Sequence, residues 1–324
     1  MTLLTLVIAF LIEQLRPLSV NNPAFKIVSA LAQWLAEALN AGERVHGRIA
    51  WLLLVVPLVV LAYLIGLGLA QLHPLLAFGW NVLLLYFTLG FRQFSHYFTD
   101  IQLALNAGDL SEARTVLTRW AQESDRNFSA ADLDASEIVR HTVRLALIAS
   151  HRHVFGVLFW AAVLPGTYGA LLYRLADYLN RRWNLPTADN QPESDFGAFA
   201  RSAFTWLDWI PVRLTALGFA VVGNFEDAIY CWRTRAQHWP GNEPGILLAS
   251  GEGALGVRLR PLTATIKENP IPDGTADQIS EPETDWEPGV PQLSTLRTAV
   301  GLVWRSVILW LIVLVLVSAG SWIR

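Results

Sequence analysis

The sequence predicts an all-α fold, that of a polytopic α-helical integral membrane protein. Hydrophobic residues make up 53% of the 324 positions, 14 residues are tryptophan, and the mean hydropathy is positive. This composition does not suit an ordinary soluble domain. A helix needs about 20 apolar residues to cross the hydrocarbon core, and the uncharged run from Ile49 to Leu72 exceeds that length. The bilayer is therefore the predicted solvent for much of the chain.

Two more apolar runs complete the predicted spans. Leu75 to Phe91 follows the first run almost directly, so we expect it to return as the second arm of a hairpin. Val300 to Trp322 is long enough to cross despite Arg305. The shorter N-terminal run ends in Glu13 and lacks a basic start and a small-residue cleavage site. We expect it to be retained rather than removed as a secretory signal.

Proline interrupts two further apolar runs near their middle. Val154 to Tyr173 contains Pro165-Gly166, and Phe204 to Gly223 contains Pro211. Such breaks are tolerated at membrane depth mainly where protein or a wet cavity receives the freed backbone groups. We therefore expect both runs to form re-entrant or interfacial helices.

Pro211 also predicts where one helix begins. Proline suits the first helical position and disfavours helical geometry at Ile210, so a helix is expected from Pro211 to about Gly223. Asp208 and Arg213 would then lie at the mouth of this helix, at the interface or in a cavity. Charges in such a place either anchor the helix or form a site.

Residues 92–153 form the predicted cytoplasmic helical region. Leucines at 103, 110 and 117 repeat every seven residues and predict one amphipathic helix, which a loop at 123–134 separates from a second. We expect the polar face of the second helix to be solvated and to carry local ion pairs. That face contains Glu137, Arg140, His141 and Arg144.

The distribution of arginine sets the predicted orientation. With the hairpin in place, residues 16–48 and 92–153 lie on one side of the membrane, and both are rich in arginine, which marks the cytoplasmic side. If the proline-broken runs do not span, residues 92–299 stay on that side and the main loops are cytoplasmic. The net charge of −3 predicts no nucleic-acid partner.

These features divide the chain into six predicted parts. The first three are an N-terminal apolar and amphipathic segment (1–48), a transmembrane hairpin (49–91) and cytoplasmic amphipathic helices (92–153). The last three are proline-broken membrane-associated helices with the candidate site (154–260), a loop rich in proline and acid (261–299) and a C-terminal transmembrane helix (300–324).

Few short motifs indicate chemistry. Arg174, Asp177 and Arg181 share a helical face and form either an anion-binding stripe or an anchor at the membrane edge. The glycine spacing of "GEGALG" at 251–256 matches a dinucleotide loop, but no alternation of strand and helix follows it. We interpret it as a glycine-rich turn. His151 and His153 point apart on a helix and do not suit one metal.

Four segments occur in the order found in one protein family. They are "NAGDLSEAR" (106–114), "VLFWAAVLPGTYGALLYRLADYLN" (157–180), "LDWIPVRL" (207–214) and "GALGVRL" (253–259). In this order they resemble the CobD/CbiB family, integral inner-membrane proteins of cobalamin biosynthesis. The resemblance covers most of the chain and implies a multi-pass protein of a bacterial-type inner membrane.

The resemblance implies the activity of an adenosylcobinamide-phosphate synthase. Such an enzyme joins a propionate of the corrinoid adenosylcobyric acid to an aminopropanol, or to its phosphate, as an amide, with ATP and Mg²⁺. On this resemblance the carboxylate and amide work falls to Asp177, Asn180, Asp208 and Glu252. Phosphate or propionate would be bound by Arg174, Arg213 and Arg258. The metal ligands stay unassigned.

The chain departs from this family pattern in its carboxylates. "ALIASHRHVFG" stands where the family has a Glu-Asn-Thr-x-Asp-Gly run, and Phe204 and Thr205 stand where it has an Asp pair. The acid-poor stretch, "VLFW" and "LDWIPVRL" also resemble AmpE proteins, membrane components linked to β-lactamase induction and cell-wall sensing. A non-enzymatic membrane sensor with a membrane or cytoplasmic protein partner is therefore the alternative to a synthase.

Overall fold

The fold is built from α-helices, which confirms the predicted class. The computed structural model describes residues 2–15, 23–40, 42–185, 195–239, 244–260 and 288–322. Across these ranges the one β pairing is a single bridge between Val257 and Gly289. Most of the predicted proline-rich and acidic loop, at 261–287, lies outside the described residues.

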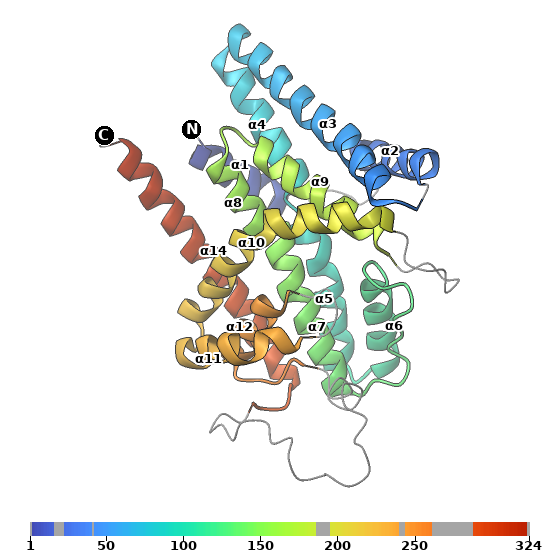
Figure 1. Cartoon of the computed structure of the whole chain (residues 1–324). Coiled ribbons are helices and arrows are strands. Elements are labelled where there is room, and N and C mark those ends of the chain that lie inside the picture. The colour runs from blue at the N-terminus through green and yellow to red at the C-terminus, as the bar shows by residue number, and fades with distance from the viewer. Residues whose placement is uncertain are drawn as a thin grey trace.

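Four helices are described between residues 2 and 88, and the last two form the predicted hairpin. They are α1 (Thr2–Leu15), α2 (Pro23–Leu39), α3 (Arg44–Leu72) and α4 (Pro74–Thr88). The hairpin turns at His73, whose imidazole accepts the Leu75 N–H at 3.2 Å, while Pro74 occupies the first helical position, where its missing N–H costs nothing. Figure 1 shows α3 and α4 projecting together from one end of the molecule.

The region predicted to be cytoplasmic, 92–153, has three helices where the sequence predicted two. They are α5 (Phe91–Asn106), α6 (Leu110–Ala121) and α7 (Ala135–Ser150). Gly108 has a φ of +75°, which favours glycine, and the Asp109 side chain then caps α6 by accepting the Glu112 N–H at 3.0 Å. The leucine repeat therefore continues across a turn, because a seven-residue spacing does not show whether one helix or two carry it.

The two arginines on the polar face of α7 are buried, and Glu137 and His141 are half-buried, so the prediction that this face is solvated was wrong, whereas its predicted local ion pair is present. Arg140 is 3% exposed and Arg144 is 7% exposed. The Arg140 side chain pairs with Glu137 and donates to the Arg258 carbonyl at 3.1 Å. The Arg144 guanidinium lies 5.6 Å from the centre of the Trp239 ring. Segments far along the chain cover this face, and helical periodicity cannot reveal them.

The helix that begins with α7 continues through a π-helical turn, His151–Phe155, into α8 (Gly156–Val163). The predicted break at Pro165-Gly166 is confirmed: Gly166 has a φ of +70°, and α9 (Tyr168–Trp183) starts just beyond it. A single π-turn inserts an extra residue into the helical register and is common at functional sites.

Pro211 does not begin a helix, so that prediction was wrong. It lies inside α10 (Ala198–Val222), which follows a short 3₁₀ turn, Asp195–Gly197. Proline lacks the N–H that would bond the Leu207 carbonyl one turn earlier. The Trp160 indole N–H donates to that carbonyl instead, at 3.1 Å. In Figure 1 the first half of α10 crosses the molecule and its second half turns away, as expected of a proline kink.

Replacing Trp160 with phenylalanine should therefore destabilise the protein by about 1–3 kcal/mol, because the Leu207 carbonyl loses its donor in a partly buried place. Adding Pro211→Ala should recover part of the loss, since alanine supplies the helical N–H. The check is a double-mutant cycle of thermal unfolding in detergent. Strictly additive effects of the two substitutions would contradict this account.

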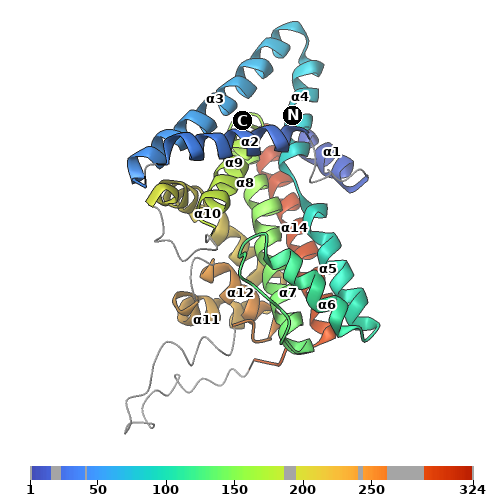
Figure 2. The same cartoon turned by 90° about the vertical axis from the view of Figure 1, so that its right-hand side faces the viewer.

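The C-terminal third contains α11 (Phe225–Arg235), a 3₁₀ turn (Ala236–His238), α12 (Gly245–Leu255) and α14 (Leu293–Trp322). The "GEGALG" segment lies largely in α12 and ends in a left-handed cap at Gly256, with a φ of +67°. A Cβ on Gly253 would lie 2.2 Å from the Asp227 carbonyl oxygen, so this glycine lets α11 and α12 touch. Figure 2 shows α11 and α12 side by side, and α14 runs beside α7.

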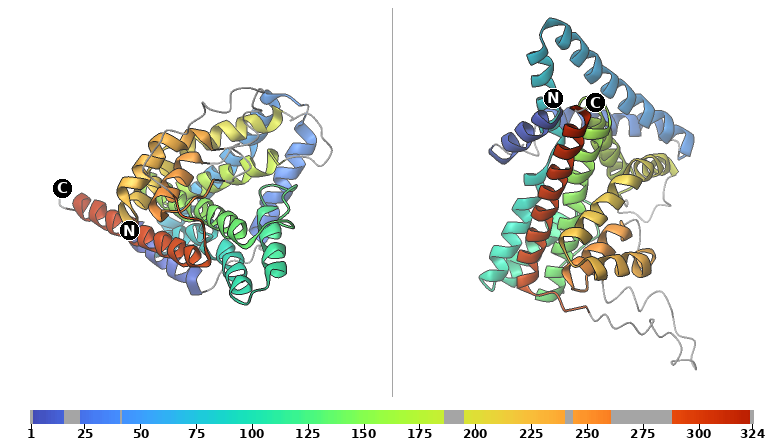
Figure 3. Two further views of the ribbon diagram at one scale, coloured as in Figure 1. Left: turned by 90° about the horizontal axis from the view of Figure 1, so that it is seen from below. Right: turned by 90° about the vertical axis from the view of Figure 1, so that its left-hand side faces the viewer.

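The exposed apolar surface lies mainly on one half of the molecule. Large exposed hydrophobic residues gather on α1, α2, α3, α4, α10 and the second half of α14, whereas α5, α6, α7, α11 and α12 carry few. Figure 3 shows α3 and the end of α14 at the same end of the molecule. Among the described residues, four helical stretches are long and apolar enough to cross a membrane: Arg44–Leu72, Ala135–Val163, Asp195–Val222 and Leu293–Val317. The chain is thus a polytopic membrane protein.

The four stretches differ in how much of their apolar surface is buried inside the protein. In Arg44–Leu72 and Leu293–Val317, 22% of the apolar window is buried inside the protein, against 56% in Ala135–Val163 and 39% in Asp195–Val222. The outer face of α10 exposes Trp206 and Trp209, a residue type enriched at membrane interfaces. Both of the more buried stretches are nevertheless long and apolar enough to cross a membrane, so the interfacial character expected for the proline-broken runs stays a prediction.

Candidate anion-binding site

A buried carboxylate surrounded by arginines forms the centre of the candidate site. Asp177 is 0% exposed. Its Oδ2 accepts hydrogen bonds from Arg181 at 2.9 Å and from Arg174 at 3.4 Å. Its Oδ1 lies 3.7 Å from the Arg152 Nε and has no hydrogen-bond partner within the described part of the chain. One negative charge thus holds three guanidinium groups together.

The shared helical face predicted for these residues is confirmed. Arg174, Asp177 and Arg181 follow one another on α9, and the carboxylate pairs with the arginines one turn before and one turn after it. Burial lowers the pKa of Arg174 to about 10, against the opposing effect of Asp177. This guanidinium remains cationic at neutral pH.

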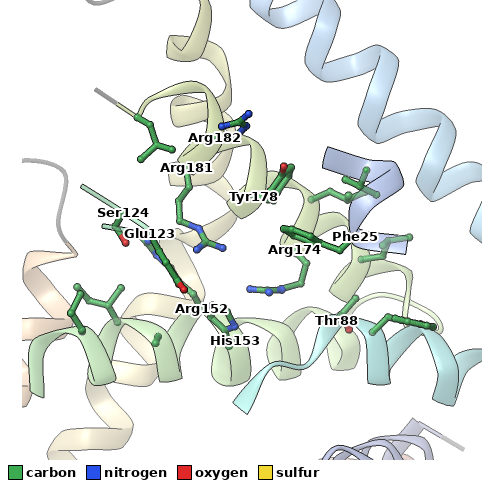
Figure 4. A pocket seen from close by; sticks show the side chains of 18 of the residues that line it. Phe25, Thr88, Glu123, Ser124, Arg152, His153, Arg174, Tyr178, Arg181 and Arg182 are labelled. Atoms are coloured by element: carbon green, nitrogen blue, oxygen red, sulfur yellow. The ribbon is translucent and has the colours of Figure 1, made fainter. Parts of the chain in front are cut away.

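These arginines open onto a cavity of about 460 Å³. Figure 4 shows Arg174, Arg181 and Arg182 extending from α9, with Arg152 and His153 from the π-helical turn below them. Glu123 and Ser124 lie across the cavity, at the end of α6. Apolar side chains complete the wall, from the C-terminal end of α4 and the start of α2: Phe25, Val28, Leu84 and Phe87.

A second buried network lies next to the arginine cluster and contains Asp208. The Asp208 Oδ1 accepts hydrogen bonds from the Tyr173 hydroxyl and the His151 Nε2, both at 2.8 Å. The other ring nitrogen of His151 lies 2.9 Å from the Thr215 hydroxyl. Burial, followed by the negative charges of Asp208 and Asp177, raises the pKa of Tyr173 well above its ordinary value, so the phenol keeps its proton and donates.

The π-helical turn connects the two networks. His151 points to Asp208, whereas the next residue, Arg152, reaches Asp177 and lies 5.6 Å from the centre of the Phe204 ring on α10. A Cβ on Gly156 would come within 2.5 Å of the Tyr173 ring and hydroxyl. Glycine at this position therefore allows Tyr173 to approach the turn and reach Asp208.

The structure separates Asp208 from Arg213, which the sequence placed together at a helix mouth. Asp208 is 8% exposed and lies in the interior. Arg213 stays on the outer side of α10, where its guanidinium lies 4.1 Å from the centre of the Trp209 ring and donates to the Trp209 carbonyl at 2.8 Å. The two residues are five positions apart in α10, a spacing that places their side chains on different faces of the helix.

Three other predicted site residues have local partners. The Asn184 side-chain amide, near the end of α9, donates to the Asn180 backbone carbonyl at 2.8 Å and to the Asn180 Oδ1 at 3.3 Å. The Glu252 carboxylate accepts from Arg235 at 3.2 Å and from the backbone N–H groups of Leu259 and Arg260 at 3.0 and 3.1 Å. Arg258 belongs to the segment that this carboxylate holds, and its N–H donates to the Gly289 carbonyl at 2.9 Å.

Replacing Glu252 with alanine should release this segment, because two backbone N–H groups and one guanidinium lose their acceptor in a place where Glu252 is 1% exposed. We expect amide exchange at Leu259 and Arg260 to accelerate at least tenfold. Hydrogen exchange followed by mass spectrometry measures this directly. Unchanged protection at both amides would show that the backbone bridge to Gly289 holds this segment without Glu252.

Sequence reasoning missed several residues of the site. Arg152, His153 and His151 were visible as ionisable residues within an apolar run, a pattern that is functional by default in membrane proteins. Their use became clear only with the π-helical turn. Glu123 and Arg182 carried no comparable signal, since each lies at the end of a different helix and spacing alone does not bring them to one cavity.

The arginine cluster fits an anion such as phosphate or carboxylate, because guanidinium groups bind both with paired hydrogen bonds. The cavity falls within the usual 300–1,000 Å³ of small-molecule sites, so at about 460 Å³ it suits a small phosphate ester or part of a nucleotide. A corrinoid is much larger and would reach it only with an edge. Among the described residues no group of three His, Cys, Asp or Glu side chains is arranged to hold a metal, so no metal ligand is assigned.

The fold and site define a class: a helical membrane protein with an arginine-lined cavity. The family model for CobD/CbiB protein matches residues 6–278. This chain therefore belongs to the CobD/CbiB family, which confirms the resemblance drawn from the four sequence segments.

Relatives agree with this assignment. The "Cobalamin biosynthesis protein CobD" of Stutzerimonas stutzeri is 33% identical over 303 residues, covering 92% of this chain and 89% of that protein. The protein of the same description from Chromobacterium violaceum is 36% identical over 216 residues, covering 67% of this chain and 65% of that protein. No solved structure matches the chain.

Proposed function

We propose that this protein acts in cobalamin biosynthesis as a synthase that joins a corrinoid carboxylate to an aminopropanol, or to its phosphate, as an amide. The corrinoid is its predicted partner and ATP its predicted co-substrate. The family assignment and the names of the relatives support the pathway. The observation that supports the reaction is the cavity with arginines 152, 174, 181 and 182 in its wall.

The arginines in the cavity wall can stabilise the phosphate charge that forms during amide synthesis. A carboxylate must be activated before an amine can displace its oxygen. Attack of the carboxylate on the terminal phosphorus of ATP gives an acyl phosphate and ADP, and attack of the amine then gives the amide and releases phosphate and a proton. Each of these steps places phosphate charge at the reacting centre, where fixed cations stabilise it. Asp177 keeps Arg152, Arg174 and Arg181 fixed before any ligand arrives.

The proposed location is a bacterial-type inner membrane with the cavity open to the cytoplasm. The arginine-rich segments 16–48 and 92–153 support this orientation. The cavity is lined by residues near the end of α4, after α6 and in the second half of α7. Water-soluble ATP and a corrinoid would then reach it from the same side.

The test is binding of adenosylcobyric acid to the detergent-purified protein, followed by absorbance, with ATP and Mg²⁺ present or absent. We expect saturable binding that strengthens with nucleotide, and rescue of a bacterial strain that lacks the synthase. A variant with Arg174→Ala and Arg181→Ala should lose both, whereas Arg233→Ala on α11 should not. No binding near millimolar ligand together with failed rescue would reject the synthase and favour the AmpE-like sensor.

A further inference from the structure

Glu123 is the one carboxylate in the wall of the arginine cavity as the structure describes it. It follows the C-terminal end of α6 and is exposed at the cavity rim. Within the described residues it makes no ion pair with arginine, lysine or histidine at 4.0 Å or less, unlike Asp177, whose charge three arginines share. Its negative charge is therefore available to a ligand.

Tyr97 of α5 holds this carboxylate in place. Its hydroxyl donates to the Glu123 Oε1 at 3.0 Å. Its ring stacks on Trp120, with centroids 5.8 Å apart and planes at 12°, and Trp120 itself lines the cavity. Burial, and then the Glu123 charge, raise the pKa of Tyr97 to about 12. The phenol therefore stays protonated and keeps donating to the carboxylate.

The cavity thus has two electrical poles. Guanidinium groups extend from α9 and, with Arg152, from the π-helical turn, whereas the Glu123 carboxylate lies just beyond the end of α6 (Figure 4). A ligand with a phosphate at one end and an ammonium a few bonds away complements both poles. A plain phosphate or a plain amine complements only one of them.

We propose that Glu123, positioned by Tyr97, binds the ammonium group of an aminoalkyl phosphate whose phosphate lies against the α9 arginines. Glu123 is then the residue that selects the amine substrate. This inference rests on the proposed function, since it assigns one end of the same cavity. It gives the carboxylate a role distinct from that of Asp177, which holds the arginines.

The experiment compares two ligands that differ by one group: 1-aminopropan-2-yl phosphate and 2-propyl phosphate. Their affinities for the detergent-purified full chain are measured by calorimetry. We expect the aminoalkyl phosphate to bind wild type at least tenfold more tightly, because the ammonium–carboxylate bond is charge-assisted. Glu123→Gln should abolish this preference and leave the affinity for 2-propyl phosphate unchanged. Tyr97→Phe should reduce the preference severalfold.

Glu112→Gln, on the exposed surface of α6, the helix that ends just before Glu123, is the matched control and should keep the preference. Equal affinity of wild type for the two ligands, or a preference that survives Glu123→Gln, would overturn the inference while leaving the arginine site intact. Failure of wild type to bind either phosphate would overturn the proposed function together with it.

Discussion

Replacing Asp177 with alanine should destabilise the protein by about 3–5 kcal/mol, the cost of breaking a buried ion pair from one side. Asp177 is fully buried, and its removal leaves Arg152, Arg174 and Arg181 close together without a counter-charge. These arginines retain some solvent contact, at 16–24% of side-chain surface, so we expect the lower part of this range. Thermal unfolding in detergent measures the loss.

An anion should partly restore this variant. Inorganic phosphate that enters the cavity can replace the lost carboxylate as counter-charge, so millimolar phosphate should raise the melting temperature of Asp177→Ala more than that of wild type. Asp132→Ala, an exposed carboxylate before α7, is the control and should melt like wild type. A variant as stable as wild type without phosphate would mean that Asp177 does not hold the cluster.

Asp208→Ala should cost about 2–6 kcal/mol, because two buried donors, the Tyr173 hydroxyl and the His151 ring, lose their acceptor at about 1–3 kcal/mol each. Asp208→Asn keeps one oxygen acceptor and should cost less. The measurement is membrane abundance together with thermal unfolding. Loss of the Asp208–His151 hydrogen bond should also disturb Arg152, the next residue in the π-helical turn. We therefore expect Asp208→Ala to bind phosphate more weakly than wild type.

Arg213→Ala on the same helix is the matched control. Its contact with Trp209 lies on the outer side of α10 and is worth about 0.5–1 kcal/mol. We therefore expect near-normal abundance for this variant. Equal losses from Asp208→Ala and Arg213→Ala would contradict the separation of the two residues. Normal abundance of Asp208→Ala with abolished activity would make Asp208 a ligand contact instead of an interior support.

The sequence by itself determined the features that depend on local periodicity and chain chemistry. The uncharged run from Ile49 to Leu72 fixed a long apolar helix, and Pro165-Gly166 fixed the break before α9. The spacing of Arg174, Asp177 and Arg181 fixed a shared helical face. Each of these follows from residues within a few turns of one another, so no knowledge of packing was needed.

Only the tertiary structure decided how these pieces act together. Pro211 stays inside a helix because Trp160, far away in sequence, supplies a donor to the Leu207 carbonyl. Asp208 is an interior residue because His151 and Tyr173 meet it there. Contacts of this kind join separate helices, and their identity depends on which faces pack together. No spacing within one segment contains that information.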